Sequence, residues 1–290
     1  MKRDVIIIAE GGCMLGVFGA GVLTAFQEAG LRQRVHSVYA SSSGAHNAAY
    51  FLGDGIKKDS SIYYEDLIRG FVRLKLIPKY LKSILTHKFK KNSICNIIDL
   101  DYVIEVESKI KKLDTGKIKK HSAEFYTRVF NIENLKWEYI DAKQDIFTAL
   151  KASSSSSPYY ADFIEINSRK YIDGSVINTR GFLKIIELNK DKKIIIILNN
   201  QYSVFRTILA LPSLLAESLV FGVLYGRKVM LKSIVSAFDY PSNEELLRYH
   251  NVHIVANDRR YSRICTDKKK LLELYNHGIK KGKNLLKNMS

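Results

Sequence analysis

The sequence predicts an α/β fold of three layers, α/β/α, around a mainly parallel central sheet with a mixed edge. Three observations predict it. Short apolar runs alternate with segments of helical spacing along most of the 290 residues. Two of these runs lead through a short turn of small residues into a helix. Near the middle of the chain, strand-like segments follow one another across short turns, which favours antiparallel pairs and so a mixed sheet.

The first elements form two units of strand, turn and helix. Val5 to Ala9 is a short apolar run that predicts a buried strand, and Val17 to Ala29 has helical spacing that stops at Gly30. Val35 to Ala40 predicts a second strand, and Gly44 to Leu52 predicts the helix that follows it.

A helical, basic insertion is predicted at about residues 60–120. Between Arg73 and Asn92 the sequence has seven basic residues, no acidic residue and several apolar residues among them. This mixture is typical of an amphipathic surface helix that faces anionic lipid, although the solvated face of a lysine-rich protein has the same pattern.

The later elements predict two strand pairs, a further strand–helix alternation and a mainly helical C-terminal part from about residue 204. The strand pairs are Phe125 to Ile132 with Trp137 to Asp141, and Phe163 to Ile166 with Lys170 to Ile172. The other predicted elements are helices over Asp145 to Ala152 and Arg180 to Leu188, and strands over Ile194 to Leu198 and Val252 to Ala256. No linker rich in glycine, proline or serine divides the chain, so we expect a single domain over residues 1–290.

Composition limits the classes of partner. Lysine and arginine number 46 against 29 aspartate and glutamate, a net charge of +17, which favours anionic surfaces such as phospholipid headgroups or nucleic acid. Because no nucleic-acid recognition module is present, we expect no specific nucleic-acid binding. The 3 cysteines are far apart, which indicates neither a disulfide framework nor a metal site, and we expect no cofactor.

We expect a cytoplasmic protein, at most peripheral at a membrane, and signal-independent secretion is left open. The first apolar run ends at Glu10 and two glycines instead of at a cleavage site, so no signal peptide is predicted. The longest apolar stretch, Val204 to Tyr225, is interrupted by Arg206, Pro212 and Glu217, which favours a packed helix over a transmembrane segment.

Three segments could supply chemistry. Tyr39 to Gly44 lies between a predicted strand and a predicted helix, where a nucleophile elbow of the GxSxG kind holds its central serine, here Ser42. The small residues that such a turn needs are Gly44 and, in part, Ala40, although a capped turn without catalysis has the same pattern.

The second segment is a glycine-rich loop, Glu10 to Gly16, whose free N–H groups would point at an oxyanion or a phosphate. Its spacing gives neither GxGxxG nor GxxxxGKS/T, which disfavours nucleotide binding. The third segment is Asp173-Gly174-Ser175, at the exit of the second strand pair, where a glycine leaves the carboxylate at a sheet edge. By itself this segment is a turn.

Together these three segments resemble the patatin-like phospholipases, above all the small bacterial members of about this length. The resemblance is strongest over Glu10 to Asn47 and resumes over Ala149 to Glu187. It implies a Ser-Asp dyad without a catalytic histidine, in which Ser42 attacks the ester carbonyl of a phospholipid or other acyl ester and Asp173 accepts the hydroxyl proton. It also implies an oxyanion hole formed by the backbone N–H groups of Gly11, Gly12 and Cys13.

Three positions depart from the family pattern beside the expected reacting centre. Cys13 and Ala40 stand where the family usually has glycine, and Leu15 stands where it usually has arginine. These departures leave open a catalytically weak or silent member that acts as a basic lipid-binding or adaptor protein. A Ser-His-Asp triad is the other arrangement that activates a serine, and its candidate histidines are His46, His250 and His253.

Overall fold

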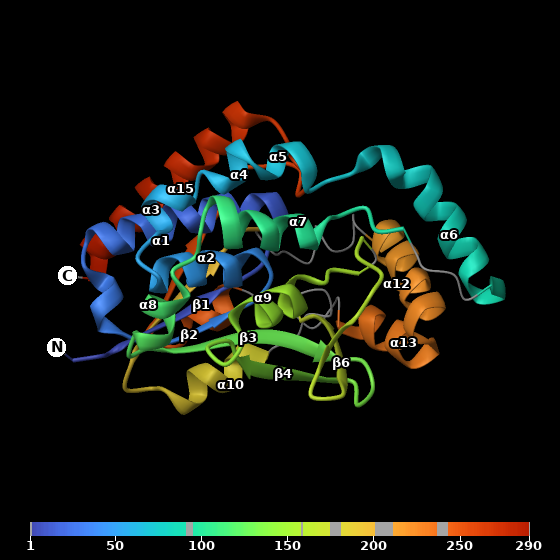
Figure 1. Ribbon diagram of the computed structural model, residues 1–290. Helices are drawn as coiled ribbons and strands as arrows, with labels where there is room; N and C mark the ends of the chain where they lie inside the picture. The colour runs from blue at the N-terminus through green and yellow to red at the C-terminus, as the bar shows by residue number, and fades with distance from the viewer. Residues whose placement is uncertain are drawn as a thin grey trace.

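The computed structural model describes residues 2–90, 95–157, 159–174, 181–200, 211–236 and 243–289. Within them lies an 8-stranded sheet with the pairing order β5-β6-β3-β2-β1-β7-β8, and β4 pairs with β3 outside this path (Figure 1). The strands are β1 (Val5–Ala9), β2 (Val35–Ala40), β3 (Glu124–Asn131), β4 (Lys136–Asp141), β5 (Ile164–Ile166), β6 (Arg169–Asp173), β7 (Lys193–Leu198) and β8 (Val252–Ala256).

The sheet is mixed in the predicted way. Strands β3, β2, β1, β7 and β8 are parallel neighbours, whereas β4, β6 and β5 are joined by antiparallel pairs. Side chains of β1 alternate between two cores, because both faces of the sheet are covered. Val5 and Ile7 belong to the larger core on the side of α1, and Ile6 and Ile8 pack with Ile186 of α10 on the other side. The predicted α/β sandwich is confirmed.

The helices that cover the α1 side of the sheet come from both ends of the chain. Figure 1 shows α15 lying along α1 above the sheet, with α2 and α7 beside them, while α10 covers the opposite face. These helices are α1 (Gly16–Glu28), α2 (Ser43–Leu52), α7 (Leu100–Glu105), α10 (Gly181–Leu188) and α15 (Lys268–Met289). Together with the sheet they bury the core that supports the turns at the carboxyl ends of β1 and β2.

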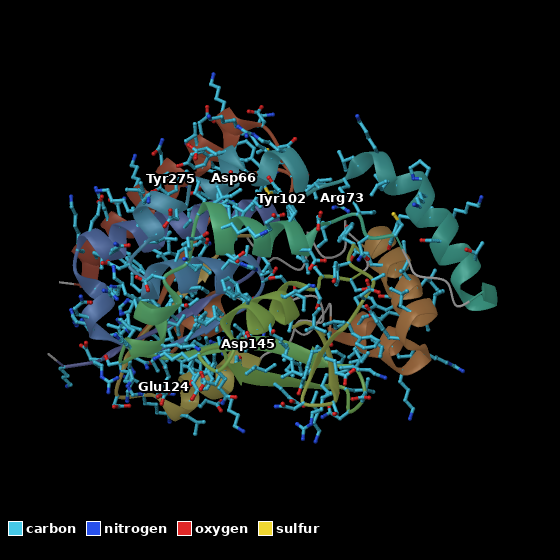
Figure 2. The ribbon with its side chains drawn as sticks, in the orientation of Figure 1. Asp66, Arg73, Tyr102, Glu124, Asp145 and Tyr275 are labelled. Carbon is cyan, nitrogen blue, oxygen red and sulfur yellow. The ribbon has the colours of Figure 1, made fainter. Side chains whose placement is uncertain are left out.

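The segment predicted as a helical insertion is a chain of mostly short helices. These are α3 (Ile56–Asp59), α4 (Ile62–Glu65), α5 (Leu67–Gly70), α6 (Ile77–Lys90), α7, a π-helical turn (Val106–Ile110) and α8 (Thr115–Lys120). Helix α6 extends away from the sheet beside α12 (Figure 1). Near its start, Arg73 pairs with Asp99, and the Tyr102 hydroxyl donates to the Asp66 carbonyl at 3.1 Å; Arg73, Tyr102 and Asp66 are labelled in Figure 2. Lys91 and Asn92, at the end of the predicted basic helix, lie outside the described residues.

The predicted helices after the insertion are found with small shifts at their ends. Helix α9 (Ile146–Ser154) begins one residue late, because the Asp145 side chain caps it by accepting from the Thr148 N–H at 3.2 Å. The described C-terminal helices are α12 (Leu211–Tyr225), α13 (Arg227–Ser236), α14 (Asn243–Leu247) and α15. Ser175, Arg180 and the start of the predicted C-terminal part at residues 204–210 lie outside the described residues. The division into a single domain stays a prediction.

Candidate active site

Ser42 lies in a sharp turn between β2 and α2. Its φ of 51° and ψ of −133° are backbone angles that an L-residue seldom adopts, at a cost on the order of 1–3 kcal/mol. Ser42 is the N-cap residue of α2, yet its side chain makes no capping hydrogen bond with the helix. The turn therefore presents a hydroxyl at the positive end of a helix dipole without using that hydroxyl to cap the helix.

Gly44 allows this turn because α2 crosses the end of β1 at close range. A Cβ at position 44 would lie 2.4 Å from the Ala9 carbonyl oxygen and 2.7 Å from that of Glu10. Both atoms belong to backbone, which cannot rotate away as a flexible side chain would. On the other side of the turn, Ala40 is 3 % exposed and pairs with Ala9, so its methyl group is accommodated.

Asp173 is the last residue of β6 and is 1 % exposed. Strand β3 pairs with β4 along one edge, so β2 and β6 share its other edge, where Ala40 lies opposite Thr127 and Asp173 lies opposite Val129. The carboxyl ends of β2 and β6 therefore face each other, with about two residues of β3, or about 7 Å, between Ala40 and Asp173. Ser42 follows Ala40 by two residues, so this register brings the elbow and the carboxylate to the same place.

Three serines at the C-terminal end of α9 contact both of these segments. We name Ser153 to Ser155 the serine turn. The Ser42 N–H donates to both the carbonyl oxygen and the hydroxyl of Ser153, at 3.0 Å each, and the Asp173 N–H donates to the Ser155 carbonyl at 3.1 Å. Sequence reasoning had assigned no role to this turn, although the run of five serines from Ser153 to Ser157 directly after a helix indicates where it lies.

The glycine-rich loop lies between β1 and α1, with free amides. Within the described part of the chain, the N–H groups of Gly11, Gly12 and Cys13 have no hydrogen-bond acceptor. Cys13 has a positive φ of 55°, a conformation that glycine adopts without strain. The cysteine is therefore held at this position against its backbone preference.

Asn199, directly after β7, links the glycine-rich loop to α1 through hydrogen bonds of its side chain. Its side-chain NH₂ donates to the Glu10 carbonyl at 2.6 Å, and its side-chain oxygen accepts from the Gly19 N–H at 2.9 Å. A Cβ at position 12 would lie 2.7 Å from the Asn199 Cβ, so only glycine fits there. Asn199 was missed by sequence reasoning, and its only indication was a polar residue at the end of a buried strand.

A buried ion pair connects the loop to β3 beneath the elbow. The Arg128 guanidinium donates to the Glu10 carboxylate at 2.8 Å, and the two side chains are 4 % and 3 % exposed. The same guanidinium lies 3.5 Å from the Ser41 hydroxyl, and the Arg128 carbonyl accepts from the Ser153 hydroxyl at 3.0 Å. Arg128 thus contacts the three segments that surround Ser42.

A family model described as patatin-like phospholipase matches residues 7–184, more than half of the chain. The chain belongs to the patatin-like phospholipase family. VipD from Legionella pneumophila is a similar solved structure, 12 % identical with a TM-score of 0.49, and the match covers 99 % of this chain and 67 % of that chain. ExoU in its complex with SpcU from the type III secretion system of Pseudomonas aeruginosa is 13 % identical with a TM-score of 0.40, covering 99 % and 52 %. A comparison with curated proteins gives no significant match.

Two of the three departures from the patatin-like pattern change the loop's chemistry little. Leu15 is 2 % exposed and packs in the larger core, so it does not face the loop's free amides. Burial raises the pKa of the Cys13 thiol to about 11, so this cysteine is neutral near pH 7. A positive charge does lie nearby, because the Arg263 guanidinium lowers the pKa of Cys13 and the Arg263 carbonyl accepts from the Met14 N–H at 3.0 Å.

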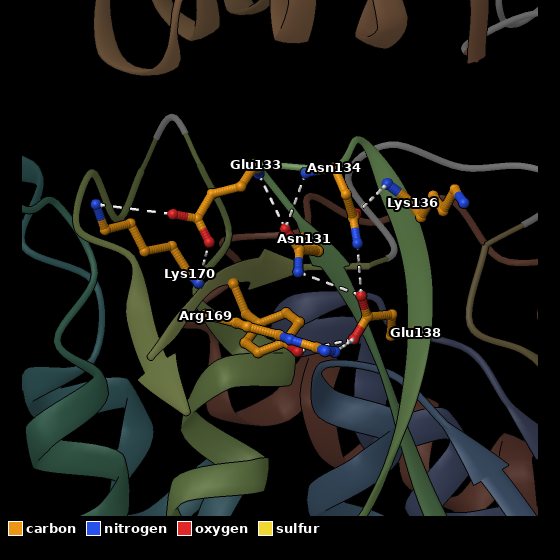
Figure 3. Close-up of polar contacts among 8 residues, drawn as sticks. Asn131, Glu133, Asn134, Lys136, Glu138, Arg169 and Lys170 are labelled. Carbon is orange, nitrogen blue, oxygen red and sulfur yellow. Dashed lines mark hydrogen bonds and ion pairs between the residues drawn. The ribbon is translucent and has the colours of Figure 1, made fainter. Parts of the chain in front are cut away.

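Two hairpins hold Asp173 in register through a polar network (Figure 3). The Glu138 carboxylate of β4 accepts from the side chains of Asn131 at 3.2 Å and Asn134 at 3.0 Å, and Arg169 of β6 lies 3.6 Å from it. Glu133 accepts from the Lys170 N–H at 3.3 Å. A slip of one residue would turn Asp173 to the other face of the sheet, so this network matters for the site.

The three candidate histidines have different surroundings. His253 lies mid-strand in β8, three strands from β2, and His250 is exposed just before β8, at the opposite end of the parallel strands. Neither is near Ser42. His46 is one helical turn from Ser42, but both of its ring nitrogens bind other partners, Glu107 and Ser154.

Among the described ranges, no group of three or more His, Cys, Asp or Glu side chains is arranged to hold a metal ion. In the same ranges, every helix is too short or too polar to cross a membrane.

Proposed function

We propose that the protein is a serine acyl hydrolase that releases fatty acid from phospholipid or related lipid esters through a dyad of Ser42 and Asp173. The main observation in support is the strained, positive-φ turn of Ser42 at the N-terminus of α2, in line with Asp173 along one edge of β3. Backbone strain of this kind persists where the surrounding structure enforces it, and it is concentrated at active sites.

In the acylation step, the Ser42 hydroxyl oxygen forms a bond with the ester carbonyl carbon while its proton passes to the Asp173 carboxylate. The carbonyl π electrons move to oxygen, and the amides of Gly11, Gly12 and Cys13 stabilise this oxyanion. Each such donor contributes on the order of 10²–10³ in rate. The ester C–O bond then breaks, and the leaving alcohol takes the proton from Asp173.

In the deacylation step, water replaces the alcohol. Asp173 accepts a proton from the water, whose oxygen attacks the acyl carbon of the Ser42 ester. The Ser42 oxygen then leaves, takes the proton back from Asp173, and the free fatty acid departs.

We also propose that the end of the molecule with α6, α12 and α13 meets an anionic membrane. On α12, Leu215, Leu219 and Val223 are 43 %, 63 % and 38 % exposed at a helical spacing that forms one apolar stripe. Exposed basic side chains occur on the two helices that pack against α12 and just before one of them, namely Lys79 and Lys82 on α6, Arg73 and Lys75 in the turn before α6, and Arg227 and Lys228 on α13. This combination favours binding at a lipid interface. Helix α12 adjoins the site, because its Phe221 belongs to the same buried cluster as Ile172, the residue before Asp173. The location within the cell stays a prediction.

The test compares wild type with Ser42→Ala and Asp173→Asn, using fatty acid release from anionic phospholipid vesicles or hydrolysis of a nitrophenyl ester. We expect each variant to lose at least about 10³-fold in kcat/KM while melting like wild type. Ser108→Ala is the matched control, because the Ser108 hydroxyl donates to the Glu105 carbonyl within its own helical turn. Equal rates in wild type and Ser42→Ala would refute the proposal.

A fluorophosphonate probe separates the proposal from the alternative of a catalytically silent lipid-binding protein. An activated Ser42 forms a covalent adduct that peptide mapping locates, and the adduct is lost in Ser42→Ala. A silent protein binds vesicles but takes up no probe.

A further inference from the structure

A second set of buried polar side chains lies next to the elbow, and the proposed dyad does not use it. The His46 Nδ1 lies 2.7 Å from Glu107 Oε1, and the His46 Nε2 lies 2.8 Å from the Ser154 hydroxyl. His46 is 8 % exposed, Ser154 is 7 % exposed and Glu107 is fully buried at 0 %. We name these three residues the His46 triplet.

The triplet brings together three separate elements. His46 belongs to α2, Ser154 is the last residue of α9, and Glu107 lies in the π-helical turn Val106–Ile110. Turns of this kind are rare and often occur at functional sites. The two ring nitrogens of His46 thus each have a polar partner, and when Nδ1 donates to the Glu107 carboxylate, Nε2 accepts from the Ser154 hydroxyl.

Burying Glu107 is costly, which argues that its contact with His46 has a purpose. Its second oxygen, Oε2, is buried and has no hydrogen-bond partner among the described residues. A buried carboxylate oxygen without a partner loses its hydration with no compensation. Among the described side chains, the contact with His46, which in turn binds Ser154, is what offsets the cost of burying the Glu107 carboxyl group.

Ser154 occupies the middle of the serine turn. The residue before it, Ser153, accepts from the Ser42 N–H, and the residue after it, Ser155, accepts from the Asp173 N–H. A displacement of Ser154 would therefore move the backbone acceptors of both dyad residues together. Among the described contacts, the Ser154 side chain is bound by His46.

We propose that His46 and Glu107 are positioning residues, which hold the serine turn and thereby set the separation of Ser42 from Asp173. The inference deepens the proposed function and rests on it for its catalytic meaning. This role differs from that of the histidine in a Ser-His-Asp triad, because His46 binds the serine turn and does not accept the proton of the nucleophile Ser42. Misplacement of reacting groups by about 1 Å lowers rates on the order of 10²-fold, which is the size of effect expected.

The geometry of the triplet also resembles a Ser-His-Glu catalytic triad, in which Ser154 would be the nucleophile. The position argues against that role. Ser154 ends α9, where the helix dipole is negative and disfavours both an alkoxide and an oxyanion. The probe experiment distinguishes the two roles, because an adduct on Ser154 would overturn the positioning role.

The first test measures amide hydrogen exchange by mass spectrometry in wild type, Ser154→Ala and Ser154→Thr. In Ser154→Ala, we expect exchange to accelerate at least about 10-fold in two peptides, one that includes Ser42 and one that includes Asp173, with no change in β7. Ser154→Thr keeps a hydroxyl and should exchange like wild type. Equal exchange in both variants, or acceleration spread evenly over the sheet, would overturn the inference.

The second test measures the rate of fluorophosphonate labelling at Ser42. We expect about a 10- to 100-fold decrease in Ser154→Ala and in Glu107→Leu, with recovery in Glu107→Gln, which keeps an acceptor for the ring N–H. His277→Asn is the control, because His277 forms a similar pair with Asp258 at 2.6 Å on α15. Labelling unchanged in Glu107→Leu would overturn the inference. A wild-type protein without labelling would instead refute the proposed function, and hydrogen exchange would still decide whether the triplet positions the two segments.

Discussion

Replacing Gly44 by alanine adds one methyl group where α2 crosses β1. The new Cβ would lie 2.4 Å from the Ala9 carbonyl oxygen, whereas ordinary van der Waals contact begins at 3.4 Å. The first turn of α2 must therefore move by about 1 Å, since the obstacle is backbone in a buried strand. Ser42 lies at the start of that turn and would move with it.

The expected cost follows from this displacement. Overpacking of a tight contact destabilises by about 1–3 kcal/mol, which lowers the melting temperature of a chain of this size by roughly 2–5 °C. A shift of about 1 Å at the nucleophile should lower kcat/KM on the order of 10²-fold. Thermal unfolding and ester hydrolysis measure the two effects separately.

Gly116→Ala is the matched control for this substitution. Its Cβ would meet one atom of the Asp114 side chain at 3.4 Å, and it lies within α8, where alanine is favoured over glycine by up to about 1 kcal/mol. We therefore expect unchanged activity and equal or higher stability. If Gly44→Ala behaves like Gly116→Ala in both assays, the inference that the close crossing of α2 over β1 requires glycine at position 44 is wrong.

Two further predictions concern the buried ion pair and the exposed apolar stripe on α12. Glu10→Gln removes the carboxylate of the buried Arg128–Glu10 ion pair, so we expect the free energy of unfolding to fall by about 3–5 kcal/mol, against no measurable change in the exposed Glu165→Gln. A loss below about 1 kcal/mol would contradict the burial of this pair. Leu219→Asp should reduce cosedimentation with anionic vesicles at least about 5-fold, whereas Leu188→Asp, at a position on α10 that is even more exposed, should not reduce it. Equal losses in the two variants would contradict membrane contact through the α12 stripe.

The sequence predicted the fold and the central elements well, because they depend on local patterns. The apolar run at Val5–Ala9 is buried on both faces, and its length and composition alone indicate such a strand. The small residue at position 44 and the turn at Asp173 likewise reflect needs of the backbone at one place in the chain. The family resemblance joined these places, and the family match over residues 7–184 confirms the family.

The contacts that surround the elbow could not be predicted in this way. Asn199 holds a carbonyl at Glu10, and Glu107 binds His46, in each case across a long stretch of chain. A polar residue after a strand, or a glutamate among lysines, has the same local pattern whether it is buried in a network or solvated.

The sequence by itself determined which segments are strands, where the backbone must turn sharply, and that the chain has the patatin-like pattern. Only the tertiary structure decided the partners of buried polar groups. The physical reason is that strand register and helix crossing set these distances, and β3 alone brings Ala40 and Asp173, from distant parts of the chain, to one edge.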